Sequence, residues 1–249
     1  MIARLDATLV RRGLARSRGQ AAEAIRAGLV SVNGRPARKP SDPVDDADVV
    51  QLSGADHYVS RAAHKLLGAL DDSRLLVAGR ALDAGASTGG FTQVLLQRGA
   101  EPVYAIDVGH DQLVPSLRND PRVRVHEGLN LRELTLDHLD GHPVDLVAGD
   151  VSFISLRLLL RPLLSVLVPA GDALLLVKPQ FEVGRRGLDS RGVVRSEAAR
   201  VRAVDDVVAD AAGLGWQQAW RGLSRTPGAS GNVEYFVHLR RPESVVRPG

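Results

Sequence analysis

Four residues far apart in the chain combine two amines with two carboxylates: Lys65, Asp150, Lys178 and Glu234. Asp150 directly follows the apolar run VDLVAG and Lys178 follows DALLLV, so each stands where a predicted strand ends. Glu234 opens the last predicted strand, which starts at the same sheet edge if it runs antiparallel. Lys65 lies on a predicted helix before the first strand, and this helix can pack beside that edge. Because open α/β sheets bind ligands at the carboxyl ends of their strands, this pattern predicts one site where an amine can remove a proton.

Lysine is rare in this chain, and its placement supports that chemistry. The 32 basic residues comprise 29 arginines and only three lysines, at positions 39, 65 and 178. A lysine amine can lose its proton when burial and neighbouring charge disfavour the ammonium form, whereas an arginine stays charged. Two of the three lysines fall in the predicted site, which favours a role for a neutral amine. Chance remains the alternative explanation, since three lysines are few.

A glycine-rich stretch, ALDAGASTGGF at residues 81–91, predicts a strand, a tight loop and the start of a helix. Asp107 ends the next predicted strand, where a carboxylate can accept hydrogen bonds from ribose hydroxyls. This layout alone fits either a dinucleotide or S-adenosylmethionine. The spacing G-A-S-T-G-G differs from G-x-G-x-x-G, and Asp83 would repel a pyrophosphate but attract an ammonium group. The pattern therefore favours S-adenosylmethionine, with a glycine-rich turn that binds nothing as the alternative.

The residues expected to contact this cofactor lie in the glycine-rich stretch or at the ends of neighbouring strands. They are Asp83, Gly85, Ala86, Ser87, Gly89, Gly90, Phe91, Asp107 and Asp150. Glu127 and Asn130, after the third strand, are placed near the adenine by their position alone. The chain has no cysteine, and no His/Asp cluster has the spacing of metal ligands, so no metal is expected.

The elements that must position these residues alternate between apolar strands and helical patterns, which predicts a mostly parallel α/β sheet covered on both faces. Strands are expected at residues 80–84, 102–107, 122–126, 144–149 and 172–178. Helices are expected at residues 58–70, 91–98, 110–118, 155–167 and 197–212. The chain ends differently, because WQQAWRGL and VEYFVHLR are two strands joined only by a loop. This pair predicts an antiparallel hairpin at or near one sheet edge.

The first fifty residues predict a separate small module with a positive charge. Two helical patterns, the second beginning at Ser17 and ending at Gly28, precede short strands with a tight turn on Asn33-Gly34. Residues 1–40 hold nine basic and two acidic residues, whereas the whole chain carries a net charge of +3. A basic module on a slightly acidic body indicates contact with a polyanion. The basic residues expected to bind RNA are Arg4, Arg11, Arg16, Arg18, Arg26, Arg35 and Lys39.

Length and composition place the chain among soluble proteins with one α/β domain and a small accessory domain. The 249 residues are 44% hydrophobic, and the charged N-terminus lacks the apolar core of a signal peptide. The most apolar stretch, residues 153–168, is interrupted by Arg157, Arg161 and Pro162, so it is too short to span a bilayer. The expected boundaries are 1–52 for the basic module, 53–57 for a linker, 58–240 for the α/β domain and 241–249 for a flexible tail. A cytoplasmic location is expected.

The four site residues resemble the K-D-K-E tetrad of FtsJ/RrmJ-type ribose 2′-O-methyltransferases. The stretches YVSRAAHKL, LDAGASTGGFT, GDVSFISL, LVKPQFEVGR and VEYFVHL resemble the TlyA family of ribosomal RNA 2′-O-methyltransferases, also called haemolysin-like. Residues RLDATLVRRGLARSRGQAAEAIRAGLVSVNGR are similar to an S4 RNA-binding domain. The resemblance implies a class I methyltransferase sheet, a Rossmann-like fold with strand order 3-2-1-4-5-7-6 and strand 7 antiparallel. It implies S-adenosylmethionine-dependent methylation of cytidine ribose in ribosomal RNA, with both 16S and 23S RNA as expected partners.

The resemblance also suggests a mechanism, in which Lys178 takes the proton of a ribose 2′-hydroxyl, helped by Lys65 and partial burial. Asp150 would orient Lys178, and Glu234 would hold Lys65 and the ribose in place. Phe181 has two interpretations, core packing or stacking on a flipped nucleotide. Three other functions remain as alternatives: an NAD-dependent oxidoreductase, a non-catalytic ribosome-assembly factor and a membrane-lytic haemolysin. The glycine spacing and Asp83 disfavour the first, and the lack of a membrane-spanning or strongly amphipathic segment disfavours the last.

Overall fold

The structure, a computed structural model, describes residues 2–15, 17–52, 58–228 and 231–242. The expected linker at 53–57, Arg16 and residues 243–249 of the expected tail lie outside these ranges. The chain divides into two units, residues 1–57 and residues 58–249. Each unit has a hydrophobic core of its own, so each is described separately.

The first unit consists of two helices and short antiparallel strands around a small core of leucine, isoleucine, valine and alanine. Its elements are β1 (Ala3–Arg4), α1 (Leu5–Arg11), α2 (Arg18–Arg26), β2 (Val30–Val32), β3 (Arg35–Pro36), β4 (Pro43–Val44) and β5 (Val50–Leu52). The Ser17 side chain accepts a hydrogen bond from the Gln20 N–H and caps α2. Asn33 and Gly34 both have positive φ in the two-residue turn between β2 and β3, as the sequence predicts.

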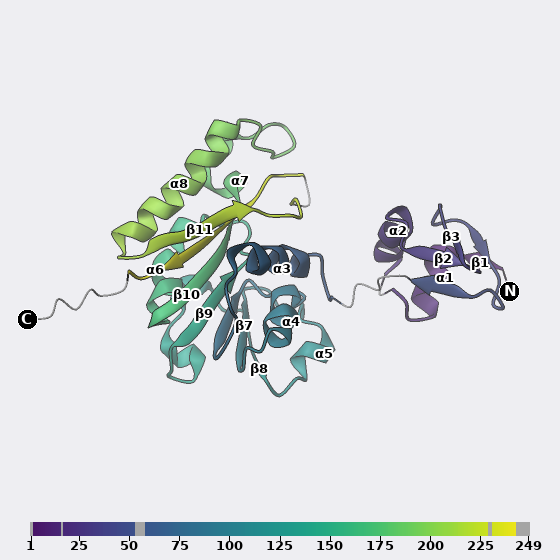
Figure 1. Cartoon of the computed structure of the whole chain (residues 1–249), viewed down its shortest axis with the longest axis horizontal. Coiled ribbons are helices and arrows are strands. Elements are labelled where there is room, and N and C mark those ends of the chain that lie inside the picture. The colour runs from purple at the N-terminus through teal and green to yellow at the C-terminus, as the bar shows by residue number, and fades with distance from the viewer. Residues whose placement is uncertain (1, 16, 53–57, 229–230, 243–249) are drawn as a thin grey trace, which may run out of the picture. The chain divides into compact units, whose positions relative to one another are not determined.

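The second unit contains a seven-stranded sheet in the order β11-β12-β10-β9-β6-β7-β8 (Figure 1). Its strands are β6 (Ala81–Ala84), β7 (Val103–Asp107), β8 (Val123–Glu127), β9 (Val144–Gly149), β10 (Leu167–Val177), β11 (Gln217–Leu223) and β12 (Tyr235–Arg240). All neighbours pair in parallel except β12, which is antiparallel to both β10 and β11. Numbered by sequence within this unit, the order is 3-2-1-4-5-7-6 with strand 7 antiparallel, which confirms the expected fold.

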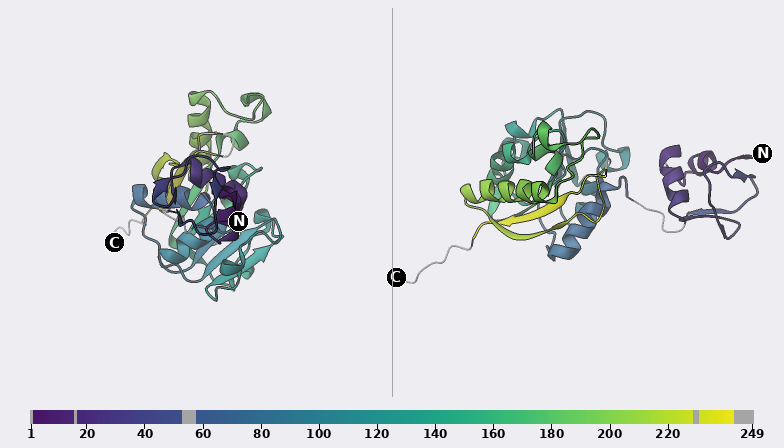
Figure 2. Two further views of the ribbon diagram at one scale, coloured as in Figure 1. Left: turned by 90° about the vertical axis from the view of Figure 1, so that its right-hand side faces the viewer. Right: turned by 90° about the horizontal axis from the view of Figure 1, so that it is seen from above.

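Helices cover both faces of this sheet, and each covered face forms its own core. The α-helices of the unit are α3 (Ala62–Ser73), α4 (Gly90–Gln97), α5 (Pro115–Arg118), α6 (Leu160–Ser165), α7 (Pro179–Glu182) and α8 (Glu197–Gly213). The 3₁₀-helices are η1 (Leu131–Glu133), η2 (Leu136–Leu139), η3 (Leu156–Leu158) and η4 (Arg185–Gly187). Helices α3 and α4 pack on one face and α6 and α8 on the other, and Figure 2 (right) shows the yellow strands between the green α8 and the blue α3. Both faces of the central strands are therefore buried, which explains their continuous apolar runs.

Two predicted helices differ from the structure, and proline accounts for both differences. The helix expected at 110–118 is wrong over most of its length, because only residues 115–118 are helical. Val114 precedes Pro115 and is extended, as the steric demand of the proline ring requires. The helix expected at 155–167 is split into η3 and a short α6. Since proline cannot donate a backbone hydrogen bond, Pro162 fits only in the first turn of α6.

Candidate active site

The four predicted residues reach one place because of the strand directions in the second unit. Asp150 follows β9 and Lys178 follows β10, which run parallel to each other. Glu234 immediately precedes β12, which runs antiparallel to β10, and Val177 pairs with Tyr235 in that ladder. Lys178 and Glu234 therefore stand next to this pair at the same sheet edge. Lys65 comes from the first half of α3, which packs on α4 beside this edge.

The two amines and two carboxylates form a connected group in the structure, and we call Lys65, Asp150, Lys178 and Glu234 the catalytic group after their predicted role. Lys65 Nζ lies 2.7 Å from Glu234 Oε2 and 3.8 Å from Asp150 Oδ2. Lys178 Nζ lies 2.6 Å from Asp150 Oδ1. None of the four side chains is more than 12% exposed, so little water screens these charges. The expected convergence of the four side chains is present, whereas their individual roles stay predictions.

Lys178 is held by a second contact that the sequence did not specify. Its Nζ donates a hydrogen bond of 2.6 Å to Ser152 Oγ. The Asp150 contact is a close charge pair rather than an aligned hydrogen bond, because Asp150 Oδ1 has no hydrogen-bond partner among the described residues. An ammonium group has three N–H groups, and the hydrogen bond to Ser152 uses one of them, so Lys178 can face both Asp150 and a bound molecule. The Lys178 amine is therefore held in position and can still contact a bound molecule.

The glycine-rich loop touches the catalytic group through its backbone. Gly85 has a φ of +90°, and a Cβ there would lie 2.9 Å from the Asp150 carbonyl oxygen. The Asp150 N–H in turn donates to the Ala84 carbonyl. Only glycine fits both the backbone conformation and this close approach. A ligand seated on the loop would consequently lie beside Asp150.

Asp83 lies buried beneath this loop, and the surroundings of its carboxylate show which kind of cofactor the site fits. Its Oδ2 accepts a hydrogen bond of 2.6 Å from Thr92 Oγ1, but its Oδ1 has no partner among the described residues. Burial raises the pKa of the Asp83 carboxyl to about 7, and the charges of Asp150 and Asp107 also raise it. A buried carboxylate oxygen that lacks a partner suits an ammonium group nearby. The methionine end of S-adenosylmethionine carries such a group, so the residues present fit this cofactor.

Asp107, at the end of β7, contacts the glycine-rich loop. Its two carboxylate oxygens accept hydrogen bonds from the backbone N–H groups of Ser87, at 2.9 Å, and Gly109, at 2.8 Å. Glu127 pairs with Arg118 at 2.6 Å, which holds the pKa of Glu127 down at about 2. Asn130 uses its side chain to cap η1. Asp107 thus adjoins the predicted cofactor loop, while the Glu127 and Asn130 side chains are occupied with local contacts.

A cavity of about 540 Å³ opens above the catalytic group. Its lining includes all four members of the group and the loop residues Gly85, Ala86, Ser87 and Phe91. The other expected cofactor residues, Asp83, Gly89, Gly90 and Asp107, lie outside the lining. Gly89 caps the N-terminus of α4 and Gly90 begins that helix, so both shape the loop from behind. This volume is in the range of small-molecule sites.

Two phenylalanines lie at the opening of this cavity. Phe153 is 92% exposed and has a positive φ of 63°, which is uncommon for a bulky residue. Its ring centroid is 5.4 Å from that of Phe181. Phe181 is half-buried and lines the cavity too, so the structure places it at the site rather than in the core. An exposed ring in a strained conformation beside a cavity suits a flat ligand surface.

Sequence reasoning missed several lining residues, among them Ser60, Arg61, Gln180, Arg191 and Asn232. Gln180 Nε2 lies 3.5 Å from Glu234 Oε1, and Gln180 Oε1 is buried without a partner in the described part of the chain. Gln180 follows Lys178 by two residues and Asn232 precedes Glu234 by two, so proximity to the predicted residues was the available signal.

The predicted RNA-binding residues of the first unit fall into two groups. Arg4 and Arg18 both contact the buried Asp6, at 3.1 and 3.0 Å. The hydrogen bond from Arg4, supported by the one from Arg18, lowers the pKa of Asp6 to about 2. Arg11 pairs with Asp46 at 2.6 Å. The second group is exposed, and no ion pair is found for it within the described ranges: Arg26, Arg35 and Lys39. Arg16 lies outside the described residues.

Metal-ligand clusters and membrane-crossing helices are both absent from the part of the chain that the structure describes. No group of three or more His, Cys, Asp or Glu side chains could hold a metal ion there. None of the described helices has both the length and the apolar character needed to cross a membrane.

Comparison with known proteins gives matches over both units. Residues 58–241 match the family model described as FtsJ-like methyltransferase, and residues 3–50 match the S4 domain. A Mycobacterium tuberculosis protein named 16S/23S rRNA (cytidine-2′-O)-methyltransferase TlyA is 54% identical over 241 residues, which cover 96% of this chain and 90% of the relative. A Bacillus subtilis protein named putative rRNA methyltransferase YqxC is 42% identical, covering 96% of this chain and 86% of that protein.

A solved structure described as a putative hemolysin from Streptococcus thermophilus is also similar. It is 40% identical with a TM-score of 0.75, and the match covers 98% of this chain and 90% of that one. Similarity at this level extends over both units rather than over the sheet alone.

Proposed function

This chain belongs to the FtsJ-like methyltransferase family, and from that premise we propose that it methylates the 2′-hydroxyl of cytidine ribose in ribosomal RNA. The proposed methyl donor is S-adenosylmethionine. The relative named for both 16S and 23S RNA shares the S4 unit and the catalytic unit with this chain, which supports both RNAs as substrates. A ribosomal substrate would place the activity in the cytoplasm.

The observation that carries this proposal is the contact between the catalytic group and the cofactor loop. Lys178 and Asp150 lie within 2.6 Å of each other, and Gly85 of the loop packs directly on the Asp150 backbone. A proton acceptor and a cofactor seat therefore adjoin within one cavity. Transfer of a methyl group to a hydroxyl needs both, held at a fixed separation.

The chain's own residues account for the proton that the reaction releases. S-adenosylmethionine, when bound, would supply a methyl group carried on a positively charged sulfur. Lys178, in its neutral form, takes the proton of the 2′-hydroxyl on the lone pair of Nζ, while its N–H groups face Asp150 and Ser152. Asp150 and Ser152 then hold the resulting ammonium group. Glu234 keeps Lys65 in place at 2.7 Å.

RNA recognition is proposed to combine the basic first unit with the aromatic rings at the cavity. The exposed arginines and lysine of the first unit would bind phosphates without reading sequence. Phe153, with Phe181 behind it, offers a face on which an extruded base can stack. Stacking of this kind would bring the ribose of that nucleotide to Lys178.

Methyl transfer to purified ribosomal subunits from a mutant lacking this protein tests the proposal. With labelled S-adenosylmethionine, the wild-type chain is expected to label the RNA. A ribose 2′-O-methyl group protects the adjoining phosphodiester from alkali, so the label should be recovered in alkali-resistant dinucleotides that begin with cytidine. Label in a base, label in a ribosomal protein or no label at all would contradict the proposal. A thermal-shift comparison of S-adenosylmethionine with NAD separates it from the oxidoreductase alternative.

A further inference from the structure

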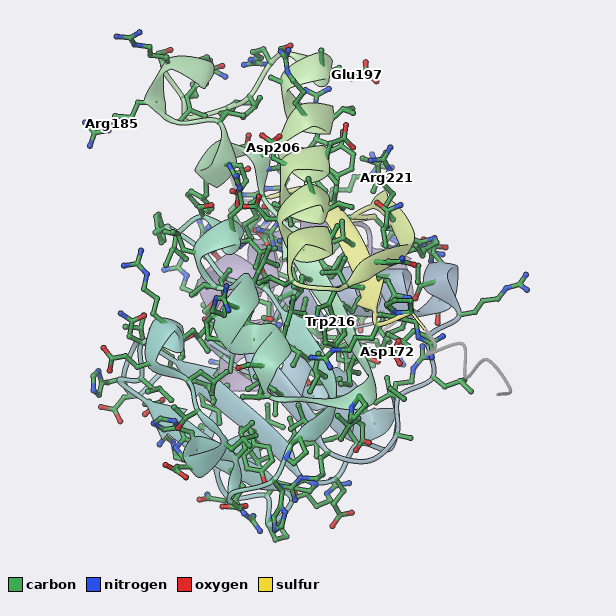
Figure 3. All side chains as sticks on the ribbon, turned by 90° about the vertical axis from the view of Figure 1, so that its left-hand side faces the viewer. Asp172, Arg185, Glu197, Asp206, Trp216 and Arg221 are labelled. Atoms are coloured by element: carbon green, nitrogen blue, oxygen red, sulfur yellow. The ribbon has the colours of Figure 1, made fainter. Side chains whose placement is uncertain are left out.

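The segment between α7 and α8 is strongly basic and is not explained by the catalytic group. Residues 183–195 contain four arginines and a single acidic residue, Asp189. Arg185 and Arg186 lie in η4, and both are exposed. Figure 3 shows the Arg185 side chain at the outer end of this segment, directed away from the body of the unit. We call residues 184–191 the arginine arm.

The charge of the arm is not neutralised within the unit. Asp189 accepts hydrogen bonds from the N–H groups of Arg191 and Val193, each at 2.9 Å, and pairs with Arg195 at 2.7 Å. The Asp189 carboxylate therefore stabilises the turn and pairs with Arg195, which lies outside the arm. Over the described residues, the guanidinium groups of Arg185, Arg186 and Arg191 make no ion pair or side-chain hydrogen bond.

The inner end of the arm is anchored by a buried side chain. Asn232, which is 4% exposed, accepts a hydrogen bond from the Val194 N–H at 3.2 Å and donates one to the Gly192 carbonyl at 3.0 Å. The Arg200 guanidinium also donates to the Val194 carbonyl at 3.0 Å. These contacts fix Gly192 and Val194, which closely follow the arginine arm in the chain. The end of the arm at Arg191 is therefore held in a defined position.

That place is the rim of the catalytic cavity. Arg191 and Gly192 line the same cavity as Lys178 and Glu234. Asn232, the anchor, stands two residues before Glu234 in the chain. A ribose bound at Lys178 carries phosphates on both sides, and at least one of them must leave the cavity over its rim. Guanidinium groups bind phosphate with paired hydrogen bonds, which makes them suited to receive it.

We propose that the arginine arm binds RNA phosphates that flank the target nucleotide, with Arg191 nearest the ribose and Arg185 and Arg186 further along the strand. This inference rests on the proposed function, because it assumes an RNA nucleotide in the cavity. The arm belongs to the catalytic unit, so it contacts RNA near the modified position independently of the first unit. An acidic protein surface is the alternative partner, which the test below distinguishes.

The test compares arm variants of the full chain with a matched surface variant. One variant carries Arg185→Ala with Arg186→Ala, and a second carries Arg191→Ala. The control is Arg161→Ala, because Arg161 is an exposed arginine on α6 outside the cavity lining. RNA affinity is titrated against salt with a ribosomal RNA fragment, and S-adenosylmethionine affinity is measured on the same preparations.

Both arm variants are expected to bind RNA less tightly than the control. The variant with Arg185→Ala and Arg186→Ala should also keep the wild-type affinity for S-adenosylmethionine, because these two residues lie outside the cavity lining. The slope of log affinity against log salt should fall by about 0.7 for each phosphate contact removed. RNA affinity and salt slope equal to those of Arg161→Ala would overturn the inference. Unchanged affinity for free RNA with weaker binding to intact subunits would also overturn it, in favour of a protein surface. Methyl transfer by wild type is scored separately, so a failure of the proposed function is recognised on its own.

Discussion

In the proposed reaction Lys178 is neutral before it takes the proton and charged afterwards, and the neighbouring charges accompany this change. Glu234 balances Lys65 at 2.7 Å, which leaves Asp150 to face Lys178 at 2.6 Å. When Lys178 is neutral, Asp150 still has the positive charge of Lys65 at 3.8 Å. Neither carboxylate is ever left without a cation nearby, and a buried unpaired charge would be costly. In the proposed mechanism, Lys65 and Glu234 therefore balance the charges around Asp150 and Lys178 without taking the proton themselves.

Asp83 leads to a prediction about pH and cofactor binding. Burial raises the pKa of its carboxyl to about 7, so below this pH the group is protonated and neutral. An ammonium group nearby favours the ionised form. Affinity for S-adenosylmethionine should therefore rise as pH increases towards 7 and then level off. Isothermal titration should give binding about tenfold weaker at pH 6 than at pH 8.

The control for this prediction is Asp83→Asn, which is expected to bind weakly at both pH values. Thermal unfolding of the variant shows whether it is folded, since the amide can still accept a hydrogen bond from Thr92 Oγ1. Equal affinities of the wild-type chain at pH 6 and pH 8 would contradict a role for Asp83 in cofactor binding.

The glycine-rich loop gives a prediction at the scale of an element. Gly85→Ala adds a Cβ 2.9 Å from the Asp150 carbonyl oxygen, in a backbone conformation with φ of +90°. Gly99→Ala is the matched control, because Gly99 has a φ of +99° but open space around it. Both variants should lose roughly 1–3 kcal/mol of stability from the backbone conformation alone. Only Gly85→Ala should also lose S-adenosylmethionine affinity.

Denaturant unfolding and cofactor titration measure these two effects separately. If Gly85→Ala binds the cofactor as tightly as Gly99→Ala, the close contact between Gly85 and the Asp150 backbone is not needed for cofactor binding.

The sheet could be predicted from sequence because its strands are apolar runs bounded by polar residues at their ends. The antiparallel position of β12 followed from two successive strands without a helix between them. Helix boundaries were less predictable where proline intervened, at Pro115 and Pro162. There, apolar spacing indicated helices, but the missing N–H and the steric demand of the ring restricted where a helix could start.

The site was predictable to the extent that strand direction determined it. Asp150, Lys178 and Glu234 could be placed at one edge from strand ends alone. The contacts of Ser152 and Asn232 could not be predicted, because they depend on how loops fold back between strands. Asp83 was expected next to the cofactor, and the structure shows it buried beneath the loop instead of on the cavity surface.

At the scale of the whole molecule, positive charge is concentrated in residues 1–40, which hold nine basic and two acidic residues. Replacing Arg26, Arg35 and Lys39 together with Ala should weaken binding of ribosomal RNA and flatten its salt dependence. The slope of log affinity against log salt should fall by about 0.7 for each lost phosphate contact. Affinity for S-adenosylmethionine should stay at the wild-type value, because the cavity lies within the second unit.

Arg98→Ala serves as the control, since Arg98 pairs with Asp71 in the second unit at 2.7 Å. A triple variant with the salt response of this control would show that the first unit does not bind RNA through these residues.

The account depends most on Lys178 as the proton acceptor of a ribose hydroxyl. Mapping of 2′-O-methyl groups on ribosomal RNA tests it in cells that lack this protein and are complemented with the wild-type chain or with Lys178→Arg. Arginine keeps the positive charge but does not release its proton. We predict methylated cytidines in both 16S and 23S RNA with wild type and none with the variant, while purified Lys178→Arg still binds S-adenosylmethionine. Wild-type levels of methylation with Lys178→Arg, or no methylation with the wild-type chain, would contradict the account.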